Sequence, residues 1–274
     1  MKKGLVSIIV PVYNAERFLE DTIKTVQDQT YENWELLLVN DCSKDNSKKI
    51  ADKYLSNKIK WIDMEKNSGA ALTRNKGIEK STGEFLCFLD ADDLWDEDKL
   101  KKQIEFMRNN KCEFSFTGYE FADENGKPIG KKVFIPEKIN YKQALKNTTI
   151  WTSTVMLDMT KLTKEDVYMP NVRRGQDTAT WWKILKKIDY AYGLNEILSY
   201  YRRTNESLSA NKITALKRTW NLYRNVEKLG LVSSCYNFCW YCFNAVKRRI
   251  KWNRKKMEKL IYLLLFRYIM LVII

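Results

Sequence analysis

The sequence predicts an α/β protein built on a doubly wound, mostly parallel sheet flanked by helices. Two observations lead to this prediction. Over about the first hundred residues, short apolar runs alternate with segments whose apolar residues recur at helical spacing, and the connections are short. In addition, residues 85–89 are five consecutive apolar residues, which is typical of a central parallel strand buried on both faces. Such alternation specifies right-handed crossovers between parallel strands.

The amino-terminal half supplies most of the predicted elements. An apolar strand at 6–12 is followed by a helix at 15–26, which Asn14 is expected to cap. The later elements of this half are a strand at 34–39, a polar helix at 47–55, a strand at 59–62, a helix at 70–79 and the buried strand at 85–89.

Beyond residue 110 the pattern is looser. The expected elements are strands at 113–119, 150–157 and within 190–201, a turn at 123–128, and helices at 178–187 and 212–229. We expect one large domain at 1–210 with two parts, 1–118 and 119–210. A helical, basic and amphipathic extension is expected at 211–274.

The buried strand at 85–89 runs directly into three carboxylates, Asp90, Asp92 and Asp93. Burying an unpaired carboxylate in a core costs several kcal/mol or more of free energy. These side chains are therefore expected at the carboxyl edge of the sheet, where open α/β sheets bind ligands. Hard oxygen ligands suit Mg²⁺ or Mn²⁺ bridging a diphosphate. The alternative is that the acids, with Asp96 and Glu97, favour the start of a helix, which explains only part of the cluster.

Composition narrows the chemistry and the partners. The sequence has no histidine, which excludes Ser-His-Asp and Cys-His catalysis and leaves proton transfer to Asp, Glu, Lys, Tyr or Cys. No signal peptide is recognisable at the amino terminus, so the six cysteines are expected to be reduced thiols in a cytosolic-facing protein. The net charge is +14, of which +8 lies in residues 233–274, and this points to an anionic surface as partner.

Several short stretches follow one another in a familiar order. They are 10–14 (Val-Pro-Val-Tyr-Asn), 39–47 (Val-Asn-Asp-Cys-Ser-Lys-Asp-Asn-Ser), 67–69 (Asn-Ser-Gly), 73–77 (Thr-Arg-Asn-Lys-Gly), 88–95 (Phe-Leu-Asp-Ala-Asp-Asp-Leu-Trp), 175–177 (Gly-Gln-Asp) and 201–209 (Tyr-Arg-Arg-Thr-Asn-Glu-Ser-Leu-Ser). Together they resemble glycosyltransferase family 2, whose members have the GT-A nucleotide-sugar fold. The resemblance covers residues 5–210 and rests on the order and context of the motifs.

The resemblance implies that residues 1–210 are a catalytic domain, with a nucleotide-sugar half at 1–118 and an acceptor half at 119–210. It implies a site for a nucleotide-sugar donor, with UDP as the expected nucleotide. Asp41 would accept the ring N–H of uracil, and Pro11 and Tyr13 are placed to support the flat base. Ser68 and Gly69 belong to the same site by resemblance. Taken alone, Asp41 is as reasonably the cap of the polar helix at 47–55.

The donor phosphates are assigned to the next group of residues. Arg74 is suited to clamp a phosphate through two N–H donors, or else is a solvated helical arginine. Asp92 would bind the Mn²⁺ or Mg²⁺ that bridges the phosphates, while Asp90 would join it as a ligand or contact the ribose or a metal-bound water. The metal would stabilise charge on the departing diphosphate. Asp93 would support these ligands from behind or cap a helix.

By the same resemblance, Asp177 is the candidate general base of an inverting transfer, and its alternative role is to cap the following helix. Many relatives carry histidine after the Tyr-Arg pair of the closing loop, where this chain has Thr204. Arg202 or Arg203 is therefore expected to contact the diphosphate instead. Trp151, Trp181 and Trp182 are suited to stack on sugars, although at least one of the last two is expected in the core.

Cysteines at 235, 239 and 242 have the spacing of the iron–sulfur loop of radical SAM enzymes. Only 32 residues follow Cys242, too few for the barrel of that family, and the spacing places the thiols on one helical face. Residues 233–252, aromatic and then basic, are better explained as an interfacial helix. Residues 260–274 are too short to span a membrane and are expected to lie in its plane or insert partly. A homodimer through this face is the alternative.

These inferences predict a metal-dependent inverting glycosyltransferase at the cytoplasmic face of a bacterial membrane. It would move a sugar from a UDP-sugar to a hydroxyl of a lipid-linked saccharide, in the assembly of capsule, O-antigen or a teichuronic-type polymer. The alternative is a non-catalytic protein of the same fold that binds a nucleotide-sugar or a membrane. Nucleic-acid binding would account for the basic tail but not for the acidic edge, so no nucleic-acid partner is expected.

Overall fold

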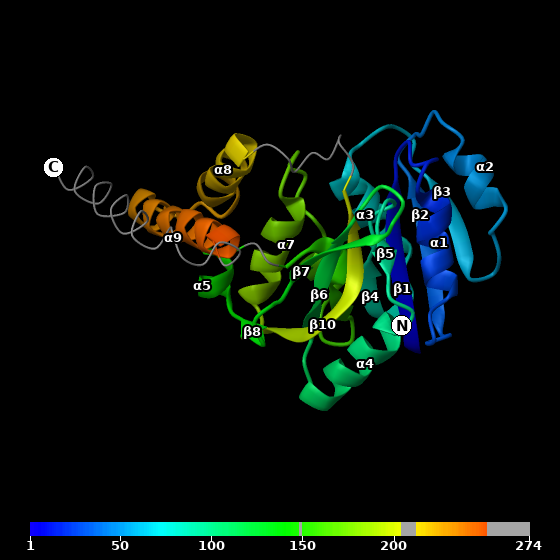
Figure 1. The fold of residues 1–274 in the computed structure, drawn as a ribbon, viewed down its shortest axis with the longest axis horizontal. Helices are drawn as coiled ribbons and strands as arrows, with labels where there is room; N and C mark the ends of the chain where they lie inside the picture. Colours follow the sequence, from blue (N-terminus) through cyan, green and yellow to red (C-terminus); the bar gives the residue numbers. More distant parts are fainter. Residues whose placement is uncertain (148–149, 204–211, 251–274) are drawn as a thin grey trace.

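The computed structural model describes residues 1–147, 150–203 and 212–250. A single mixed sheet runs through the middle of the described chain, with helices on both of its faces (Figure 1). The strands are β1 (Lys2–Val12), β2 (Trp34–Asn40), β3 (Ile59–Asp63), β4 (Gly83–Phe88), β5 (Leu94–Trp95), β6 (Phe114–Ala122), β7 (Pro128–Val133), β8 (Lys138–Ile139), β9 (Met156–Asp158) and β10 (Ala191–Arg202).

The helices connect these strands and cover the sheet. They are α1 (Leu19–Gln27), α2 (Ser47–Asp52), α3 (Ala70–Lys80), α4 (Lys99–Asn110), α5 (Tyr141–Ala144), α6 (Lys164–Val167), α7 (Gln176–Leu185), α8 (Lys212–Asn221) and α9 (Leu231–Ile250). A 3₁₀ turn, η1 (Thr152–Thr154), precedes β9, and a π-helical turn, η2 (Leu222–Val226), follows α8.

The α/β fold class is confirmed, and the sheet is wholly parallel from β1 to β4 and mixed in its second half. The strand order is β3-β2-β1-β4-β9-β6-β10-β5, with β7 on β6 and β8 on β10. Strands β1 to β4 pair in parallel. In the second half the short strand β9 pairs antiparallel with both β4 and β6, while β6 and β10 are parallel. The sheet is therefore continuous across the predicted donor and acceptor halves.

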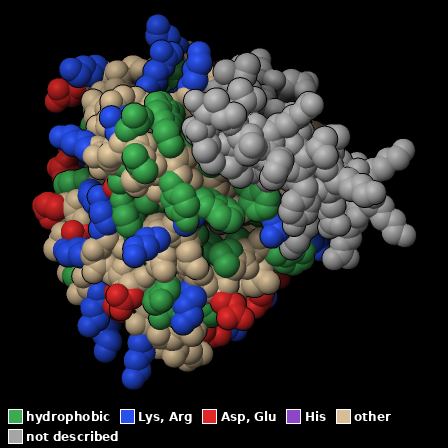
Figure 2. Space-filling view, turned by 90° about the vertical axis from the view of Figure 1, so that its left-hand side faces the viewer, with side chains coloured by type: hydrophobic (Ala, Val, Ile, Leu, Met, Phe, Trp, Pro, Cys, Tyr) green, Lys and Arg blue, Asp and Glu red, His purple; other side chains and the backbone are tan. Residues whose placement is uncertain are grey.

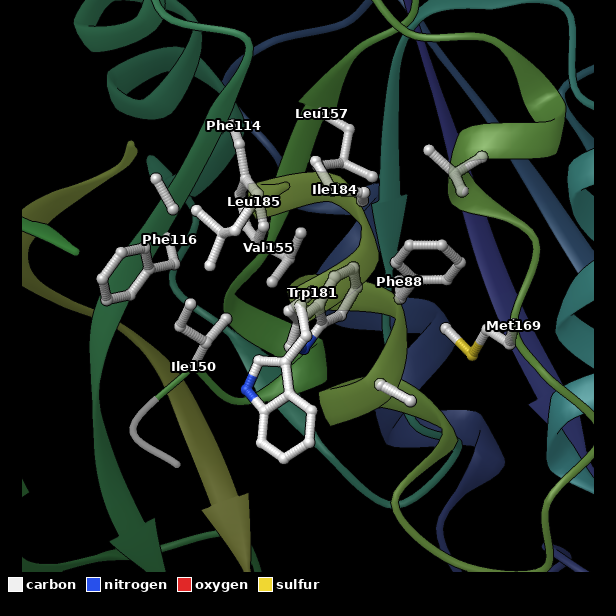
Figure 3. Close-up of a cluster of buried hydrophobic side chains, with 14 of the residues drawn as sticks. Phe88, Phe114, Phe116, Ile150, Val155, Leu157, Met169, Trp181, Ile184 and Leu185 are labelled. Carbon is white, nitrogen blue, oxygen red and sulfur yellow. The ribbon is translucent and has the colours of Figure 1, made fainter. Parts of the chain in front are cut away.

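The core forms two layers because successive strand residues point to opposite faces. On one face Val6, Ile8 and Val10 pack with apolar residues of α1 and α4. On the other face Ile9 and Phe88 pack with a cluster that surrounds Trp181 of α7. Figure 3 shows this second cluster, in which side chains from β4, β6, β9 and α7 converge on the Trp181 indole.

Some predicted elements differ from those observed. Asn14 does not cap a helix: its φ is +49°, its side chain accepts the Lys44 N–H, and α1 begins only at Leu19. The predicted strand at 150–157 is wrong over its first part, which forms η1. There Thr154 Oγ1 donates to the Trp151 carbonyl at 2.6 Å, a local bond that competes with a strand ladder.

Helix α9 has two different sides. Tyr241 is buried, and Phe238 lies 5.4 Å from Trp220 of α8, centroid to centroid, so this side packs against the rest of the protein. Val232, Tyr236 and Trp240 are exposed on the other side. Within the described part of the chain, no helix combines the length and apolar character that crossing a membrane requires. The expectation for residues 260–274 lies outside the described residues.

Candidate active site

The candidate site lies at the edge of the sheet where β1, β2 and β4 end. Val12 and Asn40 are in register at the ends of β1 and β2, and the Leu89 N–H donates to the Ile9 carbonyl just past β4. Because parallel strands present their carboxyl ends at one edge, the residues that follow them gather there. The residues are Tyr13 after β1, Asp41 after β2 and Asp90 after β4.

Polar residues of the 39–47 motif hold the loop that carries Tyr13. Ser43 Oγ accepts the Asn14 N–H at 3.0 Å, Asp45 Oδ2 accepts the Glu16 N–H at 2.8 Å, and Ser47 Oγ accepts the Ala15 N–H at 2.9 Å. These bonds fix the loop against the end of β2. The Tyr13 ring, 54% exposed, therefore stands at the edge, next to Pro11, which is half-buried within β1.

Asp41 fastens the loop before α3. Its Oδ1 accepts the Ser68 N–H at 2.7 Å and its Oδ2 accepts the Gly69 N–H at 2.8 Å. Its backbone carbonyl also accepts from the Asn67 side chain at 2.9 Å. The alternative in which Asp41 caps the helix after β2 is wrong, since that N-cap position is Asn46. Each carboxylate oxygen of Asp41 still has a second lone pair for a ligand N–H.

Arg74 and Asp90 form an ion pair between α3 and the acidic loop. Arg74 is only 6% exposed, so the alternative of a solvated helical arginine is wrong. Its Nε is buried and has no partner among the described residues. A buried guanidinium with an unused donor, paired with a carboxylate at an open edge, is suited to bind a further anionic group.

The two carboxylates after Asp90 have different surroundings. Asp93 is fully buried, where it accepts from Ser153 Oγ at 2.9 Å and from the Arg202 N–H at 3.3 Å. Burial and the nearby Asp92 raise the pKa of Asp93 well above its usual range. Asp92 forms no ion pair with any described residue. Burial, and next the charge of Asp90, raise the pKa of Asp92 to about 6. None of the three caps α4, whose N-cap is Asp98.

Asp90 and Asp92 are chemically suited to a divalent cation. Burial raises the pKa of Asp92 most and the charge of Asp90 raises it further, and a bound cation would favour the ionised form of both carboxylates. The described residues include no group of three or more His, Cys, Asp or Glu side chains arranged for a metal ion. Two carboxylates nevertheless fit Mg²⁺ or Mn²⁺, since Mg²⁺ commonly takes its remaining ligands from water and substrate phosphates.

Asp177 lies in the first turn of α7, where the N-cap is Gly175 with φ +81°, so Asp177 is not the cap. Thr152 Oγ1 of η1 donates to Asp177 Oδ2 at 3.3 Å. The neighbouring residue Ser153 binds Asp93, as described above, and its Oγ also accepts the Asp90 N–H at 3.2 Å. One short turn therefore contacts both the acidic loop and Asp177. The sequence interpretation missed Thr152 and Ser153; their run of three hydroxyl residues before a short apolar strand was the available signal.

The two arginines of the 201–209 motif differ. Arg202 is 2% exposed, its Nη2 donates to Asp21 Oδ2 at 3.0 Å, and its Nη1 donates to the Glu124 carbonyl at 2.8 Å. These contacts hold Arg202 inside the protein. Arg203 is exposed, with its guanidinium 4.9 Å from the centre of the Phe121 ring. Arg203 is therefore the better placed of the pair for a mobile anionic ligand. Thr204 lies outside the described residues.

The tryptophans separate into core and edge. Trp181 and Trp182 are both buried, and Trp182 stacks on Tyr223 of η2 at 5.4 Å, which confirms the expectation of core packing. Trp151 is half-buried directly before η1. Its ring lies 5.0 Å from Tyr119 and 4.9 Å from Tyr201, so it joins an aromatic group next to the Thr152–Asp177 contact.

Comparison with known proteins gives this geometry a family. The profile of glycosyl transferase family 2 matches residues 7–170, more than half of the chain. The chain belongs to glycosyltransferase family 2. It is therefore a glycosyltransferase, and the predicted resemblance is confirmed. Family membership therefore favours the glycosyltransferase interpretation over the iron–sulfur alternative for the three cysteines. On α9 Cys235 and Cys239 are exposed and Cys242 is half-buried, all with free thiols.

Two curated members of the family are similar over most of their length. The chain is 45% identical to the putative teichuronic acid biosynthesis glycosyltransferase TuaG of Bacillus subtilis over 250 residues, 90% of this chain and 98% of the relative. It is 39% identical over 223 residues to WfgD of Escherichia coli, named as a UDP-Glc:alpha-D-GlcNAc-diphosphoundecaprenol beta-1,3-glucosyltransferase. That match covers 81% of this chain and 86% of the relative.

Solved structures support the GT-A fold. TarS of S. aureus, residues 1–349 in complex with UDP-GlcNAc, superposes with a TM-score of 0.67 at 20% identity, covering 93% of this chain and 77% of that one. The mannosyltransferase PcManGT of Pyrobaculum calidifontis, in complex with GDP-Man and Mn²⁺, gives a TM-score of 0.66 at 16% identity. It covers 97% of this chain and 80% of that one. At these identities the likeness establishes the fold.

Proposed function

We propose that this family 2 enzyme transfers a sugar, with inversion, from a UDP-sugar to a hydroxyl of a lipid-linked saccharide, assisted by Mn²⁺ or Mg²⁺. The product would be part of a bacterial cell-surface polysaccharide. One observation carries the proposal: the turn η1 contacts both the acidic loop, through the Asp93 carboxylate and the Asp90 N–H, and the carboxylate of Asp177. A donor-side group and a candidate base thus lie on either side of one short turn. Residues 1–210 would form the catalytic domain.

In the proposed reaction Asp177 accepts the proton of the acceptor hydroxyl as its oxygen attacks the anomeric carbon. The new carbon–oxygen bond forms on the face opposite the departing phosphate oxygen, and the nucleoside diphosphate leaves. Asp177 Oδ2 accepts a hydrogen bond from Thr152, so Asp177 Oδ1 is the oxygen that would accept the proton of the acceptor hydroxyl. Asp90 and Asp92 would hold the metal, which supplies electrostatic stabilisation of the leaving diphosphate.

Residues at the carboxyl edge of the sheet support the proposed binding of the nucleotide-sugar donor. Arg74 keeps an unused buried N–H donor next to Asp90, and Arg203 is exposed beside the end of β10. Tyr13, Pro11 and the loop that Asp41 fastens would line the base and ribose. UDP is the proposed nucleotide because WfgD is named for a UDP-Glc donor and TarS was solved with UDP-GlcNAc.

The acceptor side is supported by Trp151 and by the relatives' names. Trp151 is half-buried and directly precedes Thr152, whose hydroxyl donates to Asp177, so we propose that a sugar stacked on the Trp151 ring lies near the candidate base. WfgD is named for a diphosphoundecaprenol-linked acceptor and TuaG for teichuronic acid biosynthesis. We extend to this chain the class of acceptor, a lipid-linked saccharide, and no particular sugar.

The experiment is a panel of nucleotide sugars with Mn²⁺, in which release of the nucleoside diphosphate is measured. At least one UDP-sugar should be turned over, and Asp177→Asn should keep UDP binding while lowering turnover by about a hundredfold or more. Asp189→Asn, an exposed acid that follows α7, is the matched control and should retain activity. Silence with every donor, together with no UDP binding, would contradict the proposal.

We also propose that the α9 side of the protein lies against an anionic membrane. Figure 2 views the molecule from this side and shows hydrophobic side chains gathered on this face, with Lys and Arg and some Asp and Glu around them. Val232, Tyr236 and Trp240 are exposed on α9. A groove of about 650 Å³ beside them is lined by Lys138, Lys146 and Lys247, with no acid among its lining residues. Aromatic side chains next to lysines suit a lipid headgroup region.

Vesicle binding tests this placement. Binding to vesicles that contain phosphatidylglycerol should exceed binding to neutral vesicles and fall as salt is raised. Lys138→Glu combined with Lys146→Glu should weaken it severalfold, whereas Lys49→Glu combined with Lys101→Glu, exposed lysines on other helices, should not. Equal binding by both double variants would contradict the proposal and indicate a non-specific charge effect. Dimer formation without vesicle binding would also contradict it and indicate a dimer interface.

A further inference from the structure

We infer that η1 is a positioning element that sets the candidate base against the donor carboxylates, and that Thr152 is the residue that positions Asp177. This inference rests on the proposed function, since it assigns the turn a role in that reaction. It goes beyond that function because neither Thr152 nor Ser153 would touch the reacting atoms. The observation behind it is that adjacent hydroxyls of one turn bind opposite sides of the site.

On the acceptor side, Thr152 is 3% exposed and its hydroxyl donates to Asp177 Oδ2. A carboxylate on the first turn of a helix can rotate about two side-chain torsions, and this single bond selects one orientation. It also leaves the other oxygen, Oδ1, available to the acceptor hydroxyl. Thr152 thus acts through Asp177.

On the donor side, Ser153 is fully buried and bonds twice. Its hydroxyl donates to Asp93 Oδ2 at 2.9 Å and accepts the Asp90 N–H at 3.2 Å. The first bond pins Asp93, and the second fixes the backbone that presents Asp90 and Asp92. A shift of η1 would therefore move the acidic loop and the base together, and their separation would stay constant.

The turn is held from behind by polar contacts. Trp95 Nε1 donates to the Ser153 carbonyl at 2.7 Å, and Ser199 Oγ donates to the same carbonyl at 3.2 Å. Gln103 Nε2 donates to the Thr154 carbonyl at 3.0 Å, and Gln103 Oε1 accepts from the buried Lys99 at 2.7 Å. The carbonyls that a 3₁₀ turn leaves open are thus bonded to side chains of β5, β10 and α4.

The core anchors the same turn on both of its flanks. Ile150 and Val155 are buried, and Figure 3 shows both side chains pointing into the cluster around Trp181. Trp181 lies one turn after Asp177 on α7, and its ring is 5.9 Å from Phe88, which closes β4 just before the acidic loop. The turn, the base helix and the donor strand therefore share one packed cluster, which resists relative movement.

The expected consequence is kinetic, because misplacing a catalytic group by about 1 Å can lower the rate a hundredfold. Thr152→Val keeps the shape and removes the hydroxyl. It should lower kcat about tenfold, the effect of one hydrogen bond, while the donor KM and the UDP–Mn²⁺ affinity stay within twofold. Thr152→Ser should restore most of kcat, since it restores the donor. Ser153→Ala should instead weaken UDP–Mn²⁺ binding, measured by calorimetry, about tenfold.

A double-mutant cycle separates positioning from general damage. In an Asp177→Asn background, Thr152→Val should change kcat by less than twofold, because the group through which it acts is already lost. Thr180→Val on α7, which removes a buried hydroxyl bonded to the Gln176 carbonyl, is the matched control and should leave the kinetics unchanged.

The inference is overturned if Thr152→Val leaves kcat unchanged, if its loss adds fully to that of Asp177→Asn, or if Thr152→Ser fails to restore activity. Failure of the proposed function would look different, since the wild-type protein itself would turn over no donor. Calorimetry of UDP–Mn²⁺ binding would then still test the proposed role of Ser153 on the donor side. An affinity in Ser153→Ala equal to that of the wild type would contradict that role.

Discussion

Three carboxylates within four positions have three different environments, and these environments assign their roles. Asp90 pairs with Arg74, Asp93 is buried on Ser153 and the Arg202 N–H, and Asp92 has no ion-pair partner among the described residues. The residue pattern alone predicted a metal site at this edge, and only the family resemblance gave the three acids different roles. Their partners come from α3, η1 and β10, which are far away in the chain, so only the fold reveals them.

Asp92→Asn should affect stability and binding in opposite directions. Burial and the charge of Asp90 raise the pKa of Asp92 to about 6, so at neutral pH its ionised form destabilises the metal-free protein. Removing the charge should raise Tm by a few degrees in EDTA. The same change should weaken UDP–Mn²⁺ binding at least tenfold, because a ligand oxygen anion is lost. Thermal unfolding and calorimetry measure the two effects.

The control for this variant is Glu105→Gln, an exposed acid on α4 that has the same loss of charge. It should change neither quantity appreciably. If Asp92→Asn lowers Tm in EDTA, the crowding of the acidic loop is not what limits its stability. If it binds UDP with Mn²⁺ as tightly as the wild type, the metal ligand must be assigned elsewhere.

At the scale of elements, local pattern predicted β1, β2, α3 and β4 closely, since each combines a clear period with turn residues at its ends. It failed where the chain forms η1. Apolar residues at 150 and 155–157 resemble a strand, yet the hydroxyls between them bond to local carbonyls and to distant acids. These partners, Asp93 and Asp177, lie about sixty residues before and twenty-five residues after the turn, beyond any window of local pattern. The unpredicted element is thus the one that organises the site.

The start of α4 carries an unusual buried lysine. Lys99 is fully buried, its ammonium lies 4.1 Å from the Trp95 ring centre and is hydrogen-bonded to Gln103, and it has no carboxylate partner in the described part of the chain. Burial lowers the pKa of Lys99 from 10.5 to about 8. Between these two values the unfolded chain binds a proton that the folded protein does not, so the contribution of Lys99 to stability rises with pH.

Lys99→Met should remove this dependence. The free energy of unfolding of the wild type, minus that of the variant, should increase by about 3 kcal/mol between pH 7 and pH 10.5. Urea unfolding at several pH values measures it, and taking the difference cancels the other titrating groups. Lys101→Met, at an exposed position of the same helix, should show a flat difference. A flat difference for Lys99→Met as well would mean that water reaches its ammonium.

At the scale of the whole molecule, the predicted donor and acceptor halves share one sheet and one core. Strand β9 of the acceptor half inserts between β4 and β6, and the Trp181 ring lies 5.9 Å from Phe88 and 5.4 Å from Phe114 of the donor half. Sequence periodicity predicts which residues of a strand or helix are apolar and face a core. It does not predict that the two halves meet at Trp181, because that contact depends on the order of the strands in the sheet.

Trp181→Ala should therefore destabilise the entire described fold and not one half of it. Removing a fully buried indole leaves a cavity, which costs about 3–5 kcal/mol in the free energy of unfolding. Because the ring on α7 of the acceptor half packs against two strands of the donor half, unfolding should remain a single transition, with fluorescence and circular dichroism curves that coincide in urea. Trp240→Ala, at an exposed site on α9, is the matched control and should cost less than about 1 kcal/mol. Two separated transitions in Trp181→Ala would show that the halves unfold independently, and the fixed geometry attributed to η1 would then lack its structural support.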